Sequence, residues 1–325
     1  MFLVWRAFLN DLVSVIVPVY NEAEVLEAFH LRLREALDLI AGIDSEIVYI
    51  DDGSTDASRA VLHVIQSKDP CVVIAQLSRN FGKESALSAG FDVATGDVLI
   101  VIDADLQDPP ELIDNMIQEW RKGSDVVNMR RKSREGESAF KKLTAHLFYR
   151  VINRLSDVPI LQDVGDFRLL SRRAADALRS MPERCRFMKG LYAWIGFRQI
   201  TLDYHREARY AGATKWKYWG LWNYALDGIT SFSTGPLKVA MYVGLISAAT
   251  AFFSGIYFLV KAILFGDPVP GFPTLIAAIL FLGGLQLVAV GIVGEYVGRL
   301  YHEVKARPKY VLDKVSSSGR CRTGA

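Results

Sequence analysis

The sequence predicts an α/β domain with a mostly parallel sheet, followed by two transmembrane helices. Two observations support this fold class. From residue 13 to about 130, short β-branched runs alternate with amphipathic stretches, which is the pattern of a parallel sheet covered by helices on both faces. Near the C-terminus lie two long apolar runs without a charged residue, so the α/β domain is expected to work at a membrane.

Five short runs predict the strands, and each of them ends where a turn or a polar cluster begins. They are Val13–Val19, Glu46–Ile50, Val72–Leu77, Val98–Ile102 and Asp125–Met129. In open sheets of this class, ligands bind beyond the carboxyl ends of the strands. We therefore expect the functional residues to follow these runs.

The two apolar runs are Val239–Val260 and Phe272–Gly294. As helices of more than 20 residues they would each span about 33 Å, enough for a hydrocarbon core of roughly 30 Å. The linker Phe265–Gly271 has no lysine or arginine, whereas the residues after the second run include several. These are Arg299, Lys305, Arg307, Lys309 and Lys314. The positive-inside rule then predicts an integral protein of the cytoplasmic membrane with the α/β domain and both termini in the cytoplasm.

Composition excludes some classes of protein. The 325 residues are 51% hydrophobic and carry a formal net charge of only +2, which is too balanced for a nucleic-acid binder. The three cysteines have neither metal-site nor disulfide spacing and are interpreted as ordinary thiols of a reducing compartment. The tail Ser316–Ala325 is expected to be disordered.

Three polar clusters follow three of the predicted strands and should meet at one edge of the sheet. They are Pro18-Val19-Tyr20-Asn21-Glu22, Asp51-Asp52-Gly53-Ser54 and the stretch from Asp103 to Glu111. A carboxylate there can accept the ring N–H of a uracil or guanine, and Tyr20 can stack on the base. The alternative for Asp51 and Asp52 is a turn, with Ser54 or Asp56 capping the next helix.

Asp103 and Asp105 are separated by one residue after an apolar strand. If the strand's two-residue period continues, both carboxylates point to the same side. Paired oxygen ligands suit Mg²⁺ or Mn²⁺, which would bridge to a diphosphate. Gln107 and a Pro-Pro helix start follow directly.

Together with Arg79-Asn80-Phe81-Gly82-Lys83-Glu84 and Asp163-Val164-Gly165-Asp166-Phe167-Arg168, these motifs resemble a known family. The chain is similar to family 2 glycosyltransferases of the GT-A (Rossmann-like) fold, and more narrowly to polyprenyl-phosphate glycosyltransferases such as bactoprenol glucosyltransferases and dolichyl-phosphate mannose synthases. The resemblance implies inverting transfer of a sugar from a nucleotide donor to polyprenyl phosphate at the cytoplasmic membrane face, with a divalent metal. UDP-glucose and undecaprenyl phosphate are the favoured substrates.

Several alternatives stay open at this stage. The sugar can also be mannose from GDP-mannose, or it can come from an aminoarabinose-type donor. A processive polysaccharide synthase shares the front half of the chain, but Cys185–Gly196 holds no Q-x-x-R-W motif. A membrane-anchored nucleotide sensor that has lost activity would be expected to have damaged the metal motif, and Asp103, Asp105 and Gln107 are all present.

The resemblance also implies roles for individual residues. On the donor side, Pro18, Tyr20 and Glu22 would contact the nucleoside, and Asp52, beside Asp51, would recognise the base. Arg79 and Lys83 would contact the donor phosphates. Asp103 and Asp105 would contact the metal and the diphosphate, and Gln107 the sugar or the metal. The alternative for Arg79 and Lys83 is a solvated face. On the acceptor side it offers Asp157, Asp163 and Asp166, of which Asp157 or Asp163 is favoured. Salt bridges to Arg154 or Arg168 are the alternative for these carboxylates.

Two basic segments next to apolar or aromatic residues predict contact with the lipid. Cations precede an apolar helical pattern at about 138–156, which indicates an amphipathic helix at the membrane surface; a plain charged loop before a core helix is the alternative. Arg131, Arg134, Arg206 and Arg209 are the predicted ligands of the acceptor phosphate. The predicted units are a catalytic domain at 1–210, an interfacial helix at 211–235, a hairpin at 236–298 and a basic tail at 299–325. Small residues in the second apolar run make a homo-oligomer possible.

Overall fold

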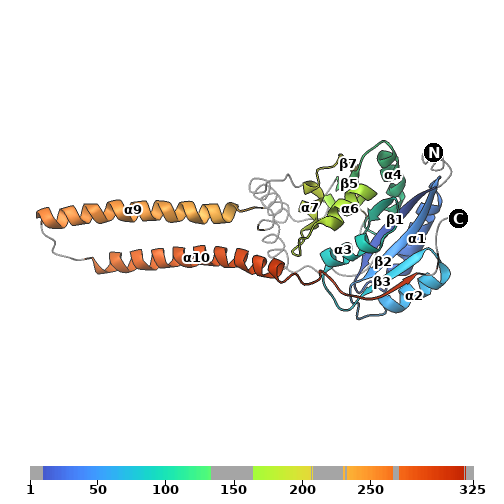
Figure 1. Ribbon diagram of the computed structural model, residues 1–325, viewed down its shortest axis with the longest axis horizontal. Helices are drawn as coiled ribbons and strands as arrows, with labels where there is room; N and C mark the ends of the chain where they lie inside the picture. Colours follow the sequence, from blue (N-terminus) through green and yellow to red (C-terminus); the bar gives the residue numbers. More distant parts are fainter. Residues whose placement is uncertain are drawn as a thin grey trace.

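The computed structural model describes residues 10–132, 164–205, 207, 230, 233–265, 271–317 and 319. Within this part of the chain, eight strands form one mixed sheet in the order β7-β5-β6-β4-β1-β2-β3-β8 (Figure 1). The strands are β1 Asp11–Val19, β2 Ile43–Asp51, β3 Val72–Leu77, β4 Val98–Val101, β5 Val126–Arg131, β6 Val164–Ser171, β7 Gln199–Tyr204 and β8 Leu312–Ser317.

The sheet is mostly parallel, and β6 and β8 are the strands that run antiparallel to their neighbours. β1 pairs in parallel with β2 and β4, β2 with β3, and β5 with β7. β6 runs antiparallel between β4 and β5, and β8 runs antiparallel along β3. The predicted fold class and all five predicted strands are confirmed, whereas β6, β7 and β8 were not predicted.

Helices cover both faces of the sheet, and the side-chain alternation of the strands explains why. In β1, Val13, Val15 and Val17 join a core cluster with α1 (Leu26–Asp38), α2 (Ser58–Lys68) and α4 (Ile113–Arg121). Ile16 points to the other face and packs with α3 (Lys83–Val93), α6 (Arg172–Ser180) and α7 (Met188–Trp194). α3 crosses β1 so closely that a Cβ on Gly90 would lie 2.3 Å from Ile16 Cγ2.

Two long helices follow the domain and form a hairpin that projects from it, α9 (Gly235–Phe265) and α10 (Phe272–Val304) (Figure 1). By length and composition both can cross a membrane, with candidate spans Gly235–Ser254 and Phe281–Val304. Large apolar side chains on both helices are exposed, including Leu245, Phe253 and Leu287. Contiguous apolar surface of this extent needs lipid or protein to cover it.

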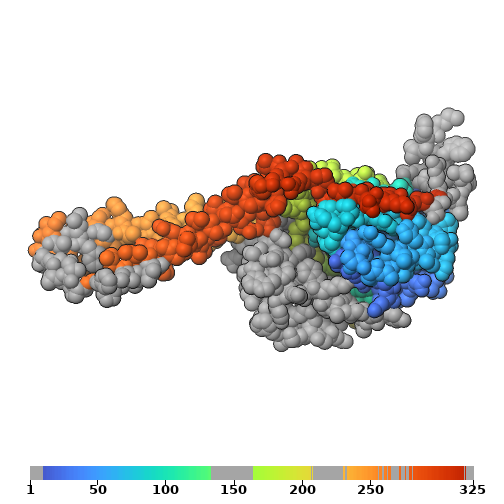
Figure 2. All heavy atoms as spheres, turned by 90° about the horizontal axis from the view of Figure 1, so that it is seen from below, coloured from blue at the N-terminus to red at the C-terminus, as the bar shows by residue number. Residues whose placement is uncertain are grey.

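The segment after α10 returns to the sheet, so the expectation of disorder is wrong for Ser316 and Ser317, while residues 318 and 320–325 of the expected tail lie outside the described residues. Ser316 and Ser317 belong to β8, and the Ser316 carbonyl accepts a hydrogen bond of 2.9 Å from the Gln66 amide. Figure 2 shows this segment, in red, lying along the surface of the domain. The interpretation of all three cysteines as ordinary thiols is also wrong, because Cys71 is disulfide-bonded; Cys185 is a free thiol.

Candidate active site

The loops after β1 and β2 are bound to each other at one edge of the sheet. Val19 and Asp51 are register partners, so the two strands end side by side. The Asn21 side-chain oxygen accepts the Thr55 N–H at 2.8 Å, and the Ser54 hydroxyl accepts the Asn21 N–H at 3.0 Å. Of the predicted nucleoside residues, Pro18 is the penultimate residue of β1, and Tyr20 and Glu22 lie on the short loop after it, from which the Tyr20 ring is exposed.

Asp51 and Asp52 are buried, and the structure uses both to build the loops. The Asp51 carboxylate accepts the Ser54 N–H at 2.9 Å and pairs with Arg59. The Asp52 oxygens accept the N–H groups of Phe81 and Gly82 at 2.7 and 2.9 Å. The turn expected as the alternative is therefore present at Asp51, while Asp52 fixes the loop before α3 at the same edge. Burial raises the pKa of Asp52 and outweighs the two N–H donors, which lower it.

Gly53 allows this junction to form. Its φ of +69° lies in the left-handed region, and a Cβ there would stand 2.4 Å from the Arg79 carbonyl carbon. Only glycine lets the second loop lie directly against the backbone at Arg79 and Asn80. Arg79 itself is exposed and its guanidinium stacks on the Phe81 ring at 4.0 Å, in keeping with the solvated face considered for it.

The first residue of α3, Lys83, joins two carboxylates from different strands. Its ammonium lies 2.7 Å from Asp103, after β4, and 2.6 Å from Asp166 in β6. The three side chains are only 38%, 24% and 19% exposed. Burial alone would lower the pKa of Lys83, but the charges of Asp103 and Asp166 raise it above its ordinary value. Burial would likewise raise the pKa of Asp166, and Lys83 and Lys189 hold it below its ordinary value. Lys83 is thus a fixed cation and Asp166 a fixed anion.

The Asp103–Asp105 pair lies in a turn, which corrects the argument from strand periodicity. β4 ends at Val101, and Leu106 has a φ of +59°. The Asp105 carboxylate accepts the Gln107 N–H at 3.1 Å. The helix expected at the double proline is present and starts at Pro110.

Asp103 and Asp105 are the described residues best suited to hold a metal ion. The described residues hold no cluster of three or more acidic, histidine or cysteine side chains suited to a metal. Two carboxylates with one residue between them nevertheless fit Mg²⁺ or Mn²⁺, which commonly take one or two carboxylates and complete their shell with water and substrate phosphates. Asp103 and Asp105 are therefore compatible with a metal that arrives together with a diphosphate.

Arg131, at the end of β5, reaches the same site. Burial would lower the pKa of Arg131, but Tyr204 and the carboxylates Asp108 and Asp103 raise it. The Tyr204 hydroxyl donates to Asp108, so β7, β5 and the turn after Asp105 form one network. Asp108 belongs to the predicted polar cluster after β4, but its partner Tyr204 was not identified because β7 was not predicted.

Five predicted site residues lie outside the described part of the chain. They are Arg134, Asp157, Asp163, Arg206 and Arg209, together with the interfacial helix expected at about 138–156. Of the three acceptor-side carboxylates considered, Asp166 is the one the structure describes, and its partner is Lys83.

Comparisons with known proteins agree with this geometry. The model of glycosyl transferase family 2 matches residues 14–179, and that of the GtrB C-terminal hairpin matches residues 235–300. The chain is 49% identical over 299 residues to the uncharacterised glycosyltransferase sll0501 of Synechocystis sp., covering 92% of this chain and 94% of that protein. It is 46% identical over 303 residues to the prophage bactoprenol glucosyl transferase homolog of Escherichia coli, covering 93% and 99%.

Among solved structures, a mannosyltransferase from Pyrobaculum calidifontis in complex with GDP-Man and Mn²⁺ matches 92% of this chain and 86% of its own at 18% identity, with a TM-score of 0.47. The extent of the family match and of the sequence identity settles the class. The chain belongs to glycosyl transferase family 2. It is a glycosyltransferase that carries the GtrB-type C-terminal hairpin, and its homologues include bactoprenol glucosyl transferases, which confirms the predicted resemblance.

Proposed function

We propose that this glycosyltransferase moves glucose from UDP-glucose to undecaprenyl phosphate at the cytoplasmic face of the membrane, with inversion at the anomeric carbon. The observation that carries the proposal is the joining of two features in one chain. A cluster of fixed charges lies at the carboxyl edge of the sheet, and two apolar helices leave the same domain. The bactoprenol glucosyl transferases that resemble the chain over almost its full length support this choice of lipid and sugar.

In the proposed reaction, an oxygen of the lipid phosphate attacks C1 of the glucosyl group from the side opposite UDP. A bond forms between C1 and that oxygen, and the bond from C1 to the β-phosphate oxygen breaks. The electron pair leaves with UDP. A phosphate monoester has its second pKa near 6 and is mostly a dianion at neutral pH, so the attacking oxygen needs no strong base. Catalysis therefore depends on orienting two anionic substrates and on stabilising the departing diphosphate.

The chain's own residues suit these tasks. Tyr20 offers an exposed ring to the nucleobase. Lys83 brings a permanent cation to Asp103, beside the donor diphosphate in this proposal. Arg131 supplies a second cation at the site and is the described candidate for the acceptor phosphate. Asp166 fixes the direction of the Lys83 side chain.

Asp103 and Asp105 would hold Mg²⁺ or Mn²⁺, which when bound supplies positive charge to the leaving diphosphate. The same proposal places the catalytic domain and both termini in the cytoplasm, following the basic residues after α10.

The test is transfer of radiolabel from UDP-glucose or GDP-mannose to the organic-extractable lipid fraction. Purified full-length protein is incubated with undecaprenyl phosphate and Mg²⁺ or Mn²⁺. Label entering the lipid from UDP-glucose, and lost with EDTA, is the expected result. Label from GDP-mannose alone would overturn the choice of sugar. Label that persists in EDTA would overturn the metal.

A further inference from the structure

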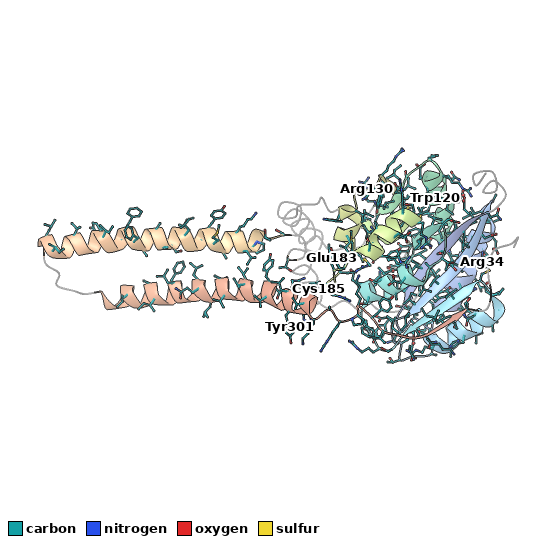
Figure 3. All side chains as sticks on the ribbon, viewed as in Figure 1. Arg34, Trp120, Arg130, Glu183, Cys185 and Tyr301 are labelled. Atoms are coloured by element: carbon teal, nitrogen blue, oxygen red, sulfur yellow. The ribbon has the colours of Figure 1, made fainter. Side chains whose placement is uncertain are left out.

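A cavity of about 230 Å³ lies where the catalytic domain meets the C-terminal end of α10, apart from the Asp103 and Asp105 turn. Three parts of the chain line it. α3 contributes Glu84 and Ser88, the loop before α7 contributes Arg184 and Arg186, and the end of α10 with the segment after it contributes Arg299 and Lys309. Figure 3 labels Cys185 and Tyr301 at this junction.

The walls of the cavity are held together by Glu303 of α10. Its carboxylate accepts the N–H groups of Arg184 and Cys185 at 2.8 and 2.9 Å. The Arg184 guanidinium in turn donates to the Arg307 carbonyl at 2.9 Å. These hydrogen bonds join α10 and the segment after it to the loop before α7 along one wall of the cavity.

The lining has an excess of positive charge. It includes four cations, Arg184, Arg186, Arg299 and Lys309, and one acidic residue, Glu84. Arg299 pairs with Glu295 at 3.2 Å. Within the described residues, the other three form no ion pair. Their hydrogen bonds go to backbone carbonyls and, for Arg186, also to the Ser88 hydroxyl.

Two acidic residues outside the lining, Asp92 and Glu183, act on Arg186 and Lys309 and offset part of their charge. Of these two, Asp92 forms its ion pair with Arg179, at 3.2 Å, and not with a cation of the lining. Burial and the charge of Arg186 lower the pKa of Lys309 to about 8, as expected where cations crowd together. Burial and the charge of Asp166 raise the pKa of Glu84, which weakens the one negative charge in the lining. A bound anion would relieve this crowding.

We infer that this cavity binds a phosphate group, held by Arg184, Arg186, Arg299 and Lys309. Guanidinium groups match the geometry of phosphate oxygens, and an ammonium adds a point charge. A volume of about 230 Å³ exceeds the space of several water molecules, so a phosphate fits.

Two sources can provide this group. Arg299 lies in the last part of the candidate span Phe281–Val304, next to the water-exposed domain. With the membrane topology of the proposed function, Arg299 would lie at the level of the lipid headgroups, where basic pockets bind anionic lipids. The headgroup of an anionic phospholipid is one source, and free phosphate from the aqueous side is the other.

The experiment uses the full chain, the double variant R299Q/K309Q and the control K305Q. Lys305 lies near the same end of α10 but contacts the Tyr301 ring at 4.1 Å and does not line the cavity. In detergent, Tm is measured with increasing sodium phosphate against sodium chloride of equal ionic strength. In a second measurement, each protein is released from nanodiscs of phosphatidylcholine with or without phosphatidylglycerol, and native mass spectrometry shows which lipids it retains.

The expected result is a saturable rise of Tm with phosphate in the wild type and in K305Q, and at least tenfold weaker binding in the double variant. Retained phosphatidylglycerol that the double variant loses would assign the site to a headgroup. A response to inorganic phosphate without retained lipid would assign it to soluble phosphate. Equal phosphate response and equal lipid retention in all three proteins would overturn the proposal. Phosphate binding at the active site would survive in the double variant and is thereby distinguished.

Discussion

Replacing Lys83 by glutamine tests whether the ammonium between Asp103 and Asp166 is a structural ion bridge. The variant leaves two largely buried carboxylates facing each other without their common cation. Breaking a fully buried pair costs about 3–5 kcal/mol, and an exposed pair is worth about 1 kcal/mol or less. Because the Lys83 side chain is 38% exposed, we expect a loss of about 2 kcal/mol. For a domain of this size, that loss lowers Tm by about 4–8 °C.

The effect should depend on pH with a definite sign. Lys83 holds the pKa of Asp166 below its ordinary value of 3.8. The stability gained from this carboxylate is therefore present above that value and is lost as pH falls through the lower folded value. The Tm difference between wild type and K83Q should be full at pH 7 and shrink as pH falls below 3.8.

The assay is thermal unfolding of the detergent-solubilised protein followed by near-ultraviolet circular dichroism. The control is Lys122→Gln, because Lys122 is 66% exposed and pairs with Glu119 on the surface. Its Tm should change by less than about 2 °C. A K83Q variant with the Tm of the control, or a deficit that does not change with pH, would refute the reasoning.

Four further predictions follow from the same geometry. Asp105→Ala should lower kcat about 100-fold or more while the protein keeps its circular dichroism spectrum; normal turnover would remove Asp105 from the metal site. Arg131→Gln should raise the KM for the lipid acceptor about tenfold and leave the donor KM nearly unchanged. The control is Arg130→Gln, which removes an exposed partner of Asp203 and should alter neither KM in steady-state kinetics. An acceptor KM raised equally in both variants would contradict the assignment. Gly53→Ala should lower stability by about 2–4 kcal/mol through a positive φ and a backbone clash, and more than Gly82→Ala, whose Cβ would meet nothing within 4 Å; the reverse order of Tm would count against the packing described. Burial raises the pKa of Glu84 from 4.5 to about 8. An acid with a raised pKa in the folded state loses its contribution to folding stability as pH rises toward that value, so the Tm of Glu84→Gln should rise relative to that of the wild type from pH 5 to pH 8. A Tm difference that stays constant over this range would contradict the prediction.

The sequence predicted the central part of the sheet because its strands are buried on both faces and read as short apolar runs. β1 and β4 are such strands. β6 and β7 carry charged residues such as Asp166, Arg168 and Asp203, so their patterns are weak, and their pairing comes from segments far along the chain. β8 is nearly all exposed and its strand depends on hydrogen bonds to β3, which composition does not reveal.

The candidate site, like the sheet, could be predicted from the sequence only in part. Motifs at strand ends, such as Asp51-Asp52 and Asp103-Ala104-Asp105, were predictable as a group because parallel strands end at one edge. The partners of individual carboxylates were not. Lys83 and Asp166 are separated by 83 positions, and only the insertion of β6 beside β4 brings them within 2.6 Å. The prediction that Asp103 and Asp105 continue the two-residue period of the strand was wrong, because β4 ends at Val101.

The central claim is that this chain joins glucose to a lipid phosphate with inversion. The most direct measurement is mass spectrometry and NMR of the lipid product formed by the purified full-length protein from UDP-glucose and undecaprenyl phosphate. The account predicts a lipid phosphate heavier by one hexose residue, with the sugar in the β configuration opposite to that of the donor. A product in the α configuration, a lipid carrying a sugar chain, or glucose found only in the aqueous phase would contradict it.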